Sequence, residues 1–149
     1  PRLGLRMMLP ADYNKLRYFA YGPLESYIDK RQASLLGWHA DTVEAQYAHP
    51  LRPQESGSHY GARSLTLHGA QGALRIEGEG FGFSALSYSQ EQLADAAHDD
   101  ELMREERCVL CLDMDQRGVG SNSCGPRLLE CYEIPEHIHW QATIDPLAE

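Results

Sequence analysis

The sequence predicts an all-β protein, an antiparallel sandwich with one short helix. Three observations predict this class: stretches in which apolar and polar residues alternate, turn signals at short and regular intervals, and a single capping pattern for a helix. The expected strands occupy residues 3–9, 15–21, 33–43, 62–67, 73–77, 81–88, 108–114, 128–134 and 138–144.

The first two stretches, residues 3–9 and 15–21, alternate like half-buried strands. Residues 10–14 between them contain a proline, an aspartate and an asparagine, which favour a turn. The pair is therefore expected to form an antiparallel hairpin. Alternation places Leu16, Tyr18 and Ala20 of the second stretch on one face of the strand, and Arg17, Phe19 and Tyr21 on the other.

Glycines separate the next strands. Turn signals at residues 68–72 and 78–80 lie between the stretches 62–67, 73–77 and 81–88, a spacing typical of a sandwich or barrel. One helix is expected after them. Ser89 followed by Gln92 is a capping-box pattern, and the helix is expected to run through Leu93, Ala96 and Ala97.

Residues 118–126 form the most distinctive loop of the sequence. Gly118, Gly120 and Gly125 allow positive φ and close approach of another group, and Pro126 restrains the exit from the loop. Composition alone favours a tight connection that binds nothing, although shaped loops on a β scaffold often carry function.

The composition limits the class of protein. The 149 residues suit one domain; 42% are hydrophobic and 23% charged, which is ordinary for a soluble globular protein. A net charge of −9 argues against nucleic acid and anionic membrane as partners, and no apolar run is long enough to span a membrane. No signal peptide is recognised, and without an initiating Met the chain reads as cut from a longer protein.

Cys108 and Cys111 have the spacing of half a zinc site. Further candidate ligands lie downstream: Cys124, Cys131, His137 and His139. Residues three apart in a strand face opposite sides of the sheet, so we expect no zinc site. Cys108, Cys111 and Cys131 are instead expected to be small buried hydrophobes of a reduced compartment.

Two polar segments offer charged side chains. Glu25 and Asp29 lie beside Lys30 and Arg31, where ion pairs that fix a turn are a commoner use than a binding site. In the turn-rich segment 47–57, the side chains of Arg52 and Glu55 are expected to satisfy backbone groups at a sheet crossing rather than to contact a ligand.

Four motifs, in order and with matching spacing, resemble one family over about residues 3–134. They are Gly22-Pro23-x-Glu25-x-Tyr27-x-Asp29, Arg52-Pro53-Gln54-Glu55-x-Gly57, Ser87-Tyr88-Ser89, and Gly118-Val119-Gly120 ahead of Ser123-Cys124-Gly125-Pro126. The chain is similar to the C-terminal domain of the large family-two β-galactosidases, which hydrolyse terminal β-D-galactosides such as lactose.

The resemblance implies a fold for this chain and places the catalytic residues in another domain of the enzyme. The family's C-terminal domain is an antiparallel β supersandwich related to galactose mutarotases, and residues 1–149 correspond to its later half. The two catalytic glutamates, the magnesium ligands and often sodium or potassium belong to a central (β/α)₈ barrel of roughly 200 residues or more, which this chain cannot contain.

The resemblance therefore implies no catalytic residue, metal or other cofactor here, and Glu25 and Glu55 are not assigned as the acid or nucleophile. The isolated chain is expected to hydrolyse nothing. Its partner would be the remainder of the enzyme or a large subunit that carries the barrel. The expected compartment is the cytoplasm.

The loop at residues 118–126 is expected to form part of the substrate-site wall. Some members of the family place a tryptophan there that stacks on the sugar beyond the galactose, and this sequence has Cys124 at that position. A thiol cannot stack as an indole does, so aglycone recognition should be weaker or altered. Asn122 and Ser123 would offer hydrogen bonds to substrate instead.

Two other functions remain open. A mutarotase-like epimerase would need a histidine acid and a carboxylate base in one cleft. A carbohydrate-binding module would use Trp38, Trp140 or Tyr88 as a platform, most plainly as a coplanar exposed pair. Half of a supersandwich should also expose sheet edges, which predicts self-association.

Overall fold

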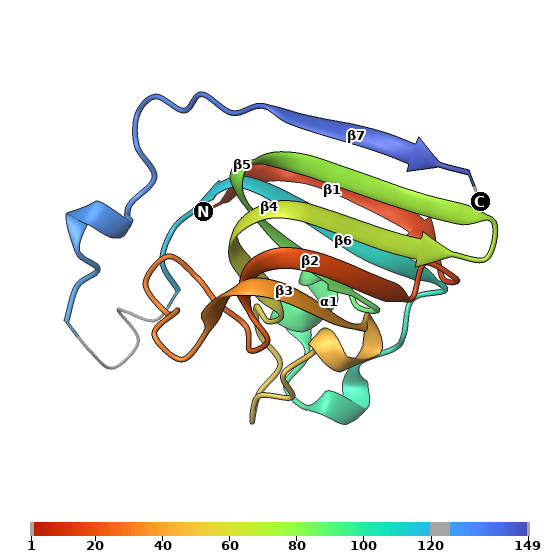
Figure 1. Cartoon of the computed structure of the whole chain (residues 1–149). Helices are drawn as coiled ribbons and strands as arrows, with labels where there is room; N and C mark the ends of the chain where they lie inside the picture. Colours follow the sequence, from red (N-terminus) through yellow and green to blue (C-terminus); the bar gives the residue numbers. More distant parts are fainter. Residues whose placement is uncertain (1, 120–125, 149) are drawn as a thin grey trace.

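Seven antiparallel strands form one sheet in the computed structural model, which describes residues 2–119 and 126–148 (Figure 1). The predicted all-β class with one short α-helix is confirmed. The strands are β1 (Arg2–Pro10), β2 (Lys15–Gly22), β3 (Leu35–Thr42), β4 (Ser58–Gly69), β5 (Gly72–Leu86), β6 (Arg107–Gln116) and β7 (Ala142–Leu147). The helices are α1 (Gln90–Asp95) and the 3₁₀ turns η1 (Glu44–Gln46), η2 (Asp99–Glu101) and η3 (Glu130–Tyr132).

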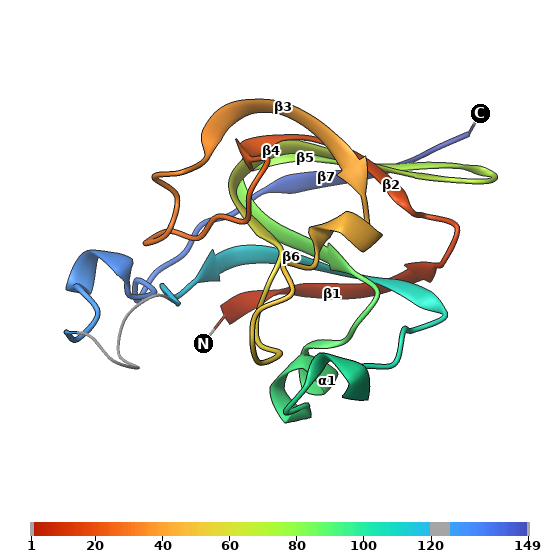
Figure 2. The ribbon, with the colours of Figure 1, turned by 90° about the horizontal axis from the view of Figure 1, so that it is seen from below.

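The sheet folds over into two layers. Its strand order is β1-β6-β5-β4-β2-β3, and β7 pairs with the first part of β5 while β6 pairs with the last part. Figure 2 shows β1 and β6 as a layer facing β2, β3 and β4, with the long β5 curving from one layer to the other. The arrangement is sandwich-like, as predicted.

A single large hydrophobic core lies between the layers. The alternating face predicted for the second strand is confirmed, because Leu16, Tyr18 and Ala20 are buried. The Tyr18 ring packs edge-on against Phe83 of β5, with ring centroids 5.2 Å apart. A smaller cluster of Tyr47, Leu86 and Leu93 attaches α1 to the sheet. The remaining buried core side chains are Val43, Ala62, Leu65, Leu67, Ile76, Phe81, Ala85, Cys108, Leu110 and Leu112.

The predicted hairpin between the first two strands is wrong. β1 pairs with β6 along its whole length, whereas β2 pairs with β3 and β4. The turn at residues 10–14 carries the chain from one layer to the other, so that Met7 and Leu9 pack against the core from the opposite side. Alternation identified both strands but carries no information on their partners.

The predicted strands at residues 73–77 and 81–88 are one continuous strand, β5. The glycines between them form a bend, where Gly80 has φ of +76°. β4 has irregular register opposite this region, between His59 and Ala62 and between Ala62 and Ser64. Glycine here curves a strand instead of ending it.

The predicted helix cap is confirmed, because the Ser89 side chain accepts a hydrogen bond from the backbone N–H of Gln92 at 3.3 Å. The helix ends at Asp95 rather than Ala97. None of the helices in the described part of the chain has the length and apolar character needed to cross a bilayer.

Two predictions near the C-terminus are wrong. Residues 128–134 form no strand; they contain η3 within irregular structure, and Leu129 and Cys131 are exposed, so Cys131 is not a buried hydrophobe. The last strand starts at Ala142 rather than Ile138 and runs to Leu147. Prolines at 126 and 135 flank the segment 128–134 and limit its pairing.

Candidate functional site

The stem of the glycine-rich loop, defined here as residues 117–119 and 128–133, is held together by specific contacts. The backbone N–H of Gly118 donates to the carbonyl oxygen of Tyr132 at 3.1 Å. An ion pair joins Arg117 to Glu133, with Nη2 and Oε1 2.7 Å apart. Leu128 is buried beneath them. Both sides of the stem are therefore placed by the protein that surrounds them.

Asp29 contacts this stem from a distant part of the sequence. Its Oδ1 accepts a hydrogen bond of 3.1 Å from the backbone N–H of Val119. A Cβ atom added to Gly118 would lie 2.6 Å from both Cγ and Oδ2 of Asp29, and 2.9 Å from Cδ1 of Leu128. Gly118 has no φ in the left-handed region, so close approach is what requires a glycine here.

Asp29 sits at the tip of a tight turn. Tyr27 and Lys30 exchange backbone hydrogen bonds of 2.9 and 3.1 Å, which leaves Ile28 and Asp29 at the apex. The fully buried Ser26 anchors the turn: its hydroxyl donates to the Tyr21 carbonyl and accepts from the Tyr60 N–H, while its own N–H donates to Ser58. The tip that presents Asp29 is therefore fixed to the sheet.

Glu25 links this turn to the second motif. Its carboxylate pairs with Lys30 Nζ at 2.5 Å and accepts hydrogen bonds from the Gly57 N–H at 3.0 Å and the Ser56 hydroxyl at 3.3 Å. Burial would raise the pKa of Glu25, but these donors hold that pKa below its ordinary value. The prediction of an ion pair that fixes the turn is confirmed for Glu25, whereas Asp29 contacts Val119.

Sequence reasoning missed a buried charge cluster behind the site. The guanidinium of Arg2 donates to both carboxylate oxygens of Asp113, at 2.8 and 2.7 Å, and to Glu55 at 3.1 Å. Burial raises the pKa of Glu55, an effect that Arg2 opposes. The expected backbone role of Glu55 is thus replaced by an ion pair, while Arg52 is exposed. The signal was available: Asp113 is a charged residue that directly follows the apolar run at residues 108–112 in the same strand.

Three of the four motifs therefore meet around the loop stem, brought there by contacts across about 30 and 90 residues. A hollow of about 510 Å³ lies beside them, lined by Leu24, Glu25, Asp29, Lys30, Arg31, Gln32, Ala33, Ser34 and Ala48. The motif at residues 87–89 lies elsewhere and caps α1. The predicted substrate-binding residues Asn122, Ser123 and Cys124 lie outside the described residues.

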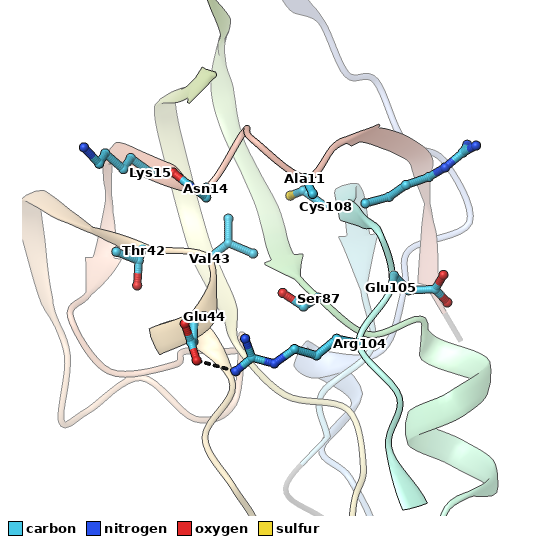
Figure 3. Close-up of a pocket in the computed structure, with 11 residues that line it drawn as sticks. Ala11, Asn14, Lys15, Thr42, Val43, Glu44, Ser87, Arg104, Glu105 and Cys108 are labelled. Atoms are coloured by element: carbon cyan, nitrogen blue, oxygen red, sulfur yellow. Dashed lines mark hydrogen bonds and ion pairs between the residues drawn. The ribbon is translucent and has the colours of Figure 1, made fainter. Parts of the chain in front are cut away.

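A separate cavity of about 370 Å³ lies at the opposite end of β6 (Figure 3). Arg104 and Glu44 form an ion pair at its mouth, and Ser87 and Cys108 contribute to its lining. β6 begins at this cavity and ends at the loop stem. A strand of this length extends about 30 Å, so the two places cannot be one site.

The structure contains a histidine–carboxylate pair, the kind an epimerase would need. His49 Nδ1 lies 3.0 Å from Asp99 Oδ2, and the Tyr47 hydroxyl donates to Asp99 Oδ1 at 2.9 Å. The pair is exposed, and the adjoining cavity of about 40 Å³ has room only for water. This geometry does not favour sugar epimerisation.

The three aromatic residues considered as a sugar platform pack edge to face with their ring neighbours. Trp38 is 55% exposed but meets Phe19 at 70°, and Arg17 lies 4.5 Å from the centre of its ring system. Tyr88 meets Tyr47 at 64°, and Trp140 meets Phe81 at 85°. None of the three pairs presents the flat double surface expected of a carbohydrate-binding module.

Cys108 and Cys111 are buried and Cys131 is exposed, all as free thiols. Burial raises the pKa of Cys108 to about 12 and also raises that of Cys111. Among residues 2–119 and 126–148, no three His, Cys, Asp or Glu side chains are grouped as metal ligands.

Comparison with known proteins matches residues 1–144 to the family described as β-galactosidase small chain. The chain is 38% identical to a β-galactosidase of Actinobacillus pleuropneumoniae over 91% of its length, 36% identical to one of Staphylococcus xylosus over 90%, and 33% identical to one of Vibrio vulnificus strain CMCP6 over 98%. These matches cover only 13%, 14% and 14% of the three relatives.

The predicted resemblance is confirmed by a match over nearly the whole chain and by identities above 30%. The chain spans about one-seventh of the length of these relatives. By these matches, and by the three motifs that meet at the loop stem, the chain belongs to the β-galactosidase small-chain family.

Proposed function

We propose that this chain is a C-terminal part of a β-galactosidase that hydrolyses terminal β-D-galactosides such as lactose. The match to the small-chain family over residues 1–144 carries the proposal. The proposed partner is the remainder of the enzyme, in the same polypeptide or in a large subunit, which supplies the catalytic carboxylates and the family's magnesium, sodium or potassium. The cytoplasm is the proposed compartment, which the free thiols of the three described cysteines support.

Two carboxylates in the motifs around the loop stem support a non-catalytic role. Glu25 is paired with Lys30, and Glu55 is paired with Arg2. Glycoside hydrolysis by two carboxylates requires one that donates a proton and one that attacks the sugar or activates water. Carboxylates committed to neighbouring cations suit neither task, so Glu25 and Glu55 are proposed to hold the shape of the motifs rather than to break bonds.

The proposed contribution to the site is the glycine-rich loop. Its stem is built from precise contacts, although it is remote in sequence from the turn that holds it. Such placement is expected of a loop that meets a substrate. We propose that Cys124, Ser123 and Asn122 contact the aglycone of a bound galactoside.

Hydrolysis of lactose and of methyl β-galactoside tests the function. The complete enzyme should hydrolyse both, and the 149-residue chain alone should hydrolyse neither. The proposal is wrong if the isolated chain turns over either galactoside, or if the complete protein turns over none.

The loop assignment has its own test in the complete enzyme. Cys124→Trp should lower the KM for lactose, because an indole stacks on a sugar face, and Cys124→Ala should shift KM or kcat. Met103→Ala, which alters an exposed side chain before the start of β6 and so at the end opposite the stem, is the control and should change neither. Unchanged constants for both Cys124 variants, with lactose and with galactosides of other aglycones, would remove Cys124 from the site.

A further inference from the structure

We propose that Asp29 is a positioning residue for aglycone recognition, acting through the backbone of Gly118 and Val119. This inference rests on the proposed function, because it names the residue that sets the place of a substrate-site loop. Asp29 itself is not assigned any contact with substrate.

The contact is specific for a carboxylate or amide oxygen. Oδ1 of Asp29 accepts the Val119 N–H at 3.1 Å, a hydrogen bond to the second residue of the motif. The hydrogen bond therefore favours one placement of the stem.

The contact also leaves no room for a side chain at residue 118. The space between the Asp29 carboxyl group and Gly118 is too small for a methyl group, because a Cβ atom there would lie 2.6 Å from Cγ. Backbone and carboxylate are therefore packed against each other as well as hydrogen-bonded. A shift of Asp29 would be transmitted directly to Gly118.

Asp29 has little freedom to shift. The Tyr27–Lys30 backbone pair closes its turn, and the Glu25–Lys30 ion pair braces it against Gly57. The opposite side of the stem is held by the hydrogen bond from Gly118 to Tyr132. Two segments far apart in the sequence, the turn at residues 27–30 and η3, thus converge on a two-residue segment that leads into the loop.

The test is steady-state kinetics of the complete enzyme with lactose, which has a sugar aglycone, and methyl β-galactoside, which has none. Asp29→Ala should raise the KM for lactose about three- to tenfold, the factor that one lost hydrogen bond implies, with a smaller change for methyl β-galactoside. Asp29→Asn keeps an oxygen acceptor and should restore most of the loss.

Asp12→Ala is the matched control. Asp12 Oδ2 accepts a hydrogen bond of 2.8 Å from the Ala70 N–H, the same kind of bond, at a turn near the far end of the sheet (Figure 1). The variant should leave the ratio of the two KM values unchanged. An equal change in this ratio for Asp12→Ala and Asp29→Ala would overturn the inference, because general destabilisation would explain both.

Gly118→Ala provides a second route if Asp29→Ala does not fold. The added methyl group must displace the Asp29 carboxylate, so the lactose KM should rise in the same direction. Unchanged KM ratios in the folded variants overturn the positioning role while leaving the proposed function intact. A complete wild-type enzyme that hydrolyses neither galactoside instead overturns the proposed function, and the inference falls with it.

Discussion

Glycine serves two physical purposes in this chain. Gly118 is required because the Asp29 carboxylate occupies the space of a side chain, whereas Gly80 has positive φ with open space within 4 Å of where a Cβ would lie. Gly57 combines both, with φ of +69° and the Gln46 carbonyl oxygen 2.4 Å from the position of an added Cβ. Sequence alone shows that all three are glycines but not which purpose each serves.

This difference predicts that alanine at Gly80 and alanine at Gly57 lower the free energy of unfolding by unequal amounts. Gly80→Ala should lower the free energy of unfolding by about 1 kcal/mol, the strain of a non-glycine residue in the left-handed region. Gly57→Ala adds a clash with backbone that cannot move aside, and should cost about 3 kcal/mol or more. Urea denaturation of the two variants and the wild-type chain measures both, and equal losses would contradict the interpretation.

The buried His59 makes the stability of the folded chain depend on pH. Its Nδ1 lies 3.1 Å from the Tyr21 carbonyl oxygen and its Nε2 lies 2.5 Å from the side-chain amide oxygen of Gln46. Burial lowers the pKa of His59 to about 4, against about 6.5 in the unfolded chain. Between these values the unfolded state binds a proton that the folded state does not, so stability falls as the pH drops below 6.5.

The expected loss attributable to His59 is about 2 kcal/mol between pH 7 and pH 5. Chemical denaturation at both pH values should therefore show a steeper loss for the wild-type chain than for His59→Gln. Subtracting the two profiles removes the contribution of the other titrating groups. Parallel profiles would show that His59 does not have a lowered pKa.

At the scale of elements, β1 carries two arginines in different settings. Arg2 binds the buried Asp113, whereas Arg6 pairs with the exposed Glu91 on α1 at 2.7 Å. Exposed ion pairs contribute little because water screens them, while an unpaired buried charge is strongly unfavourable. An arginine should therefore matter for stability at the start of β1 but not in its middle.

Asp113→Ala should destabilise the chain by about 3 kcal/mol, because it removes the buried carboxylate that accepts two hydrogen bonds from Arg2 and leaves only Glu55 as its partner. Glu91→Ala should leave the unfolding midpoint nearly unchanged. Thermal or urea unfolding of both variants provides the comparison. A loss in Glu91→Ala as large as that in Asp113→Ala would contradict the assignment.

Local patterns predicted most elements and failed where pairing is non-local. The Ser89 cap and the alternating β2 face depend on neighbours in sequence, and both were predicted correctly. The partner of β1 depends on β6, more than 90 residues away, and no local pattern contains that information. The same limit hid the Asp29–Val119 contact, since neither residue is unusual in its own segment.

At the scale of the whole molecule, the apolar residues of the sheet edges are incompletely covered. Leu35 is 76% exposed and Trp38 55% exposed on β3, and Leu3 and Leu5 are exposed on β1. β1 and β3 end the main strand order of the described sheet. Unpaired edges with exposed apolar side chains favour association with another chain.

The isolated chain is therefore expected to self-associate. Light scattering should give an average mass that rises with concentration above that of the monomer. Leu35→Lys, which places a charge on the β3 edge, should reduce the association, whereas Leu51→Lys on an exposed loop should not. A constant monomer mass at all concentrations would contradict this prediction.

The register between β1 and β6 has a consequence for biosynthesis. Arg2 bonds to a residue 111 positions later, and Pro10 faces Arg107, so β1, the first of the seven described strands to be translated, has no partner in this sheet until β6 has emerged from the ribosome. Nascent chains halted before residue 107 should leave β1 open to proteases, and those extended past β6 should protect it. Assembly of the loop stem must wait longer still, because its second side follows β6 in the order of translation.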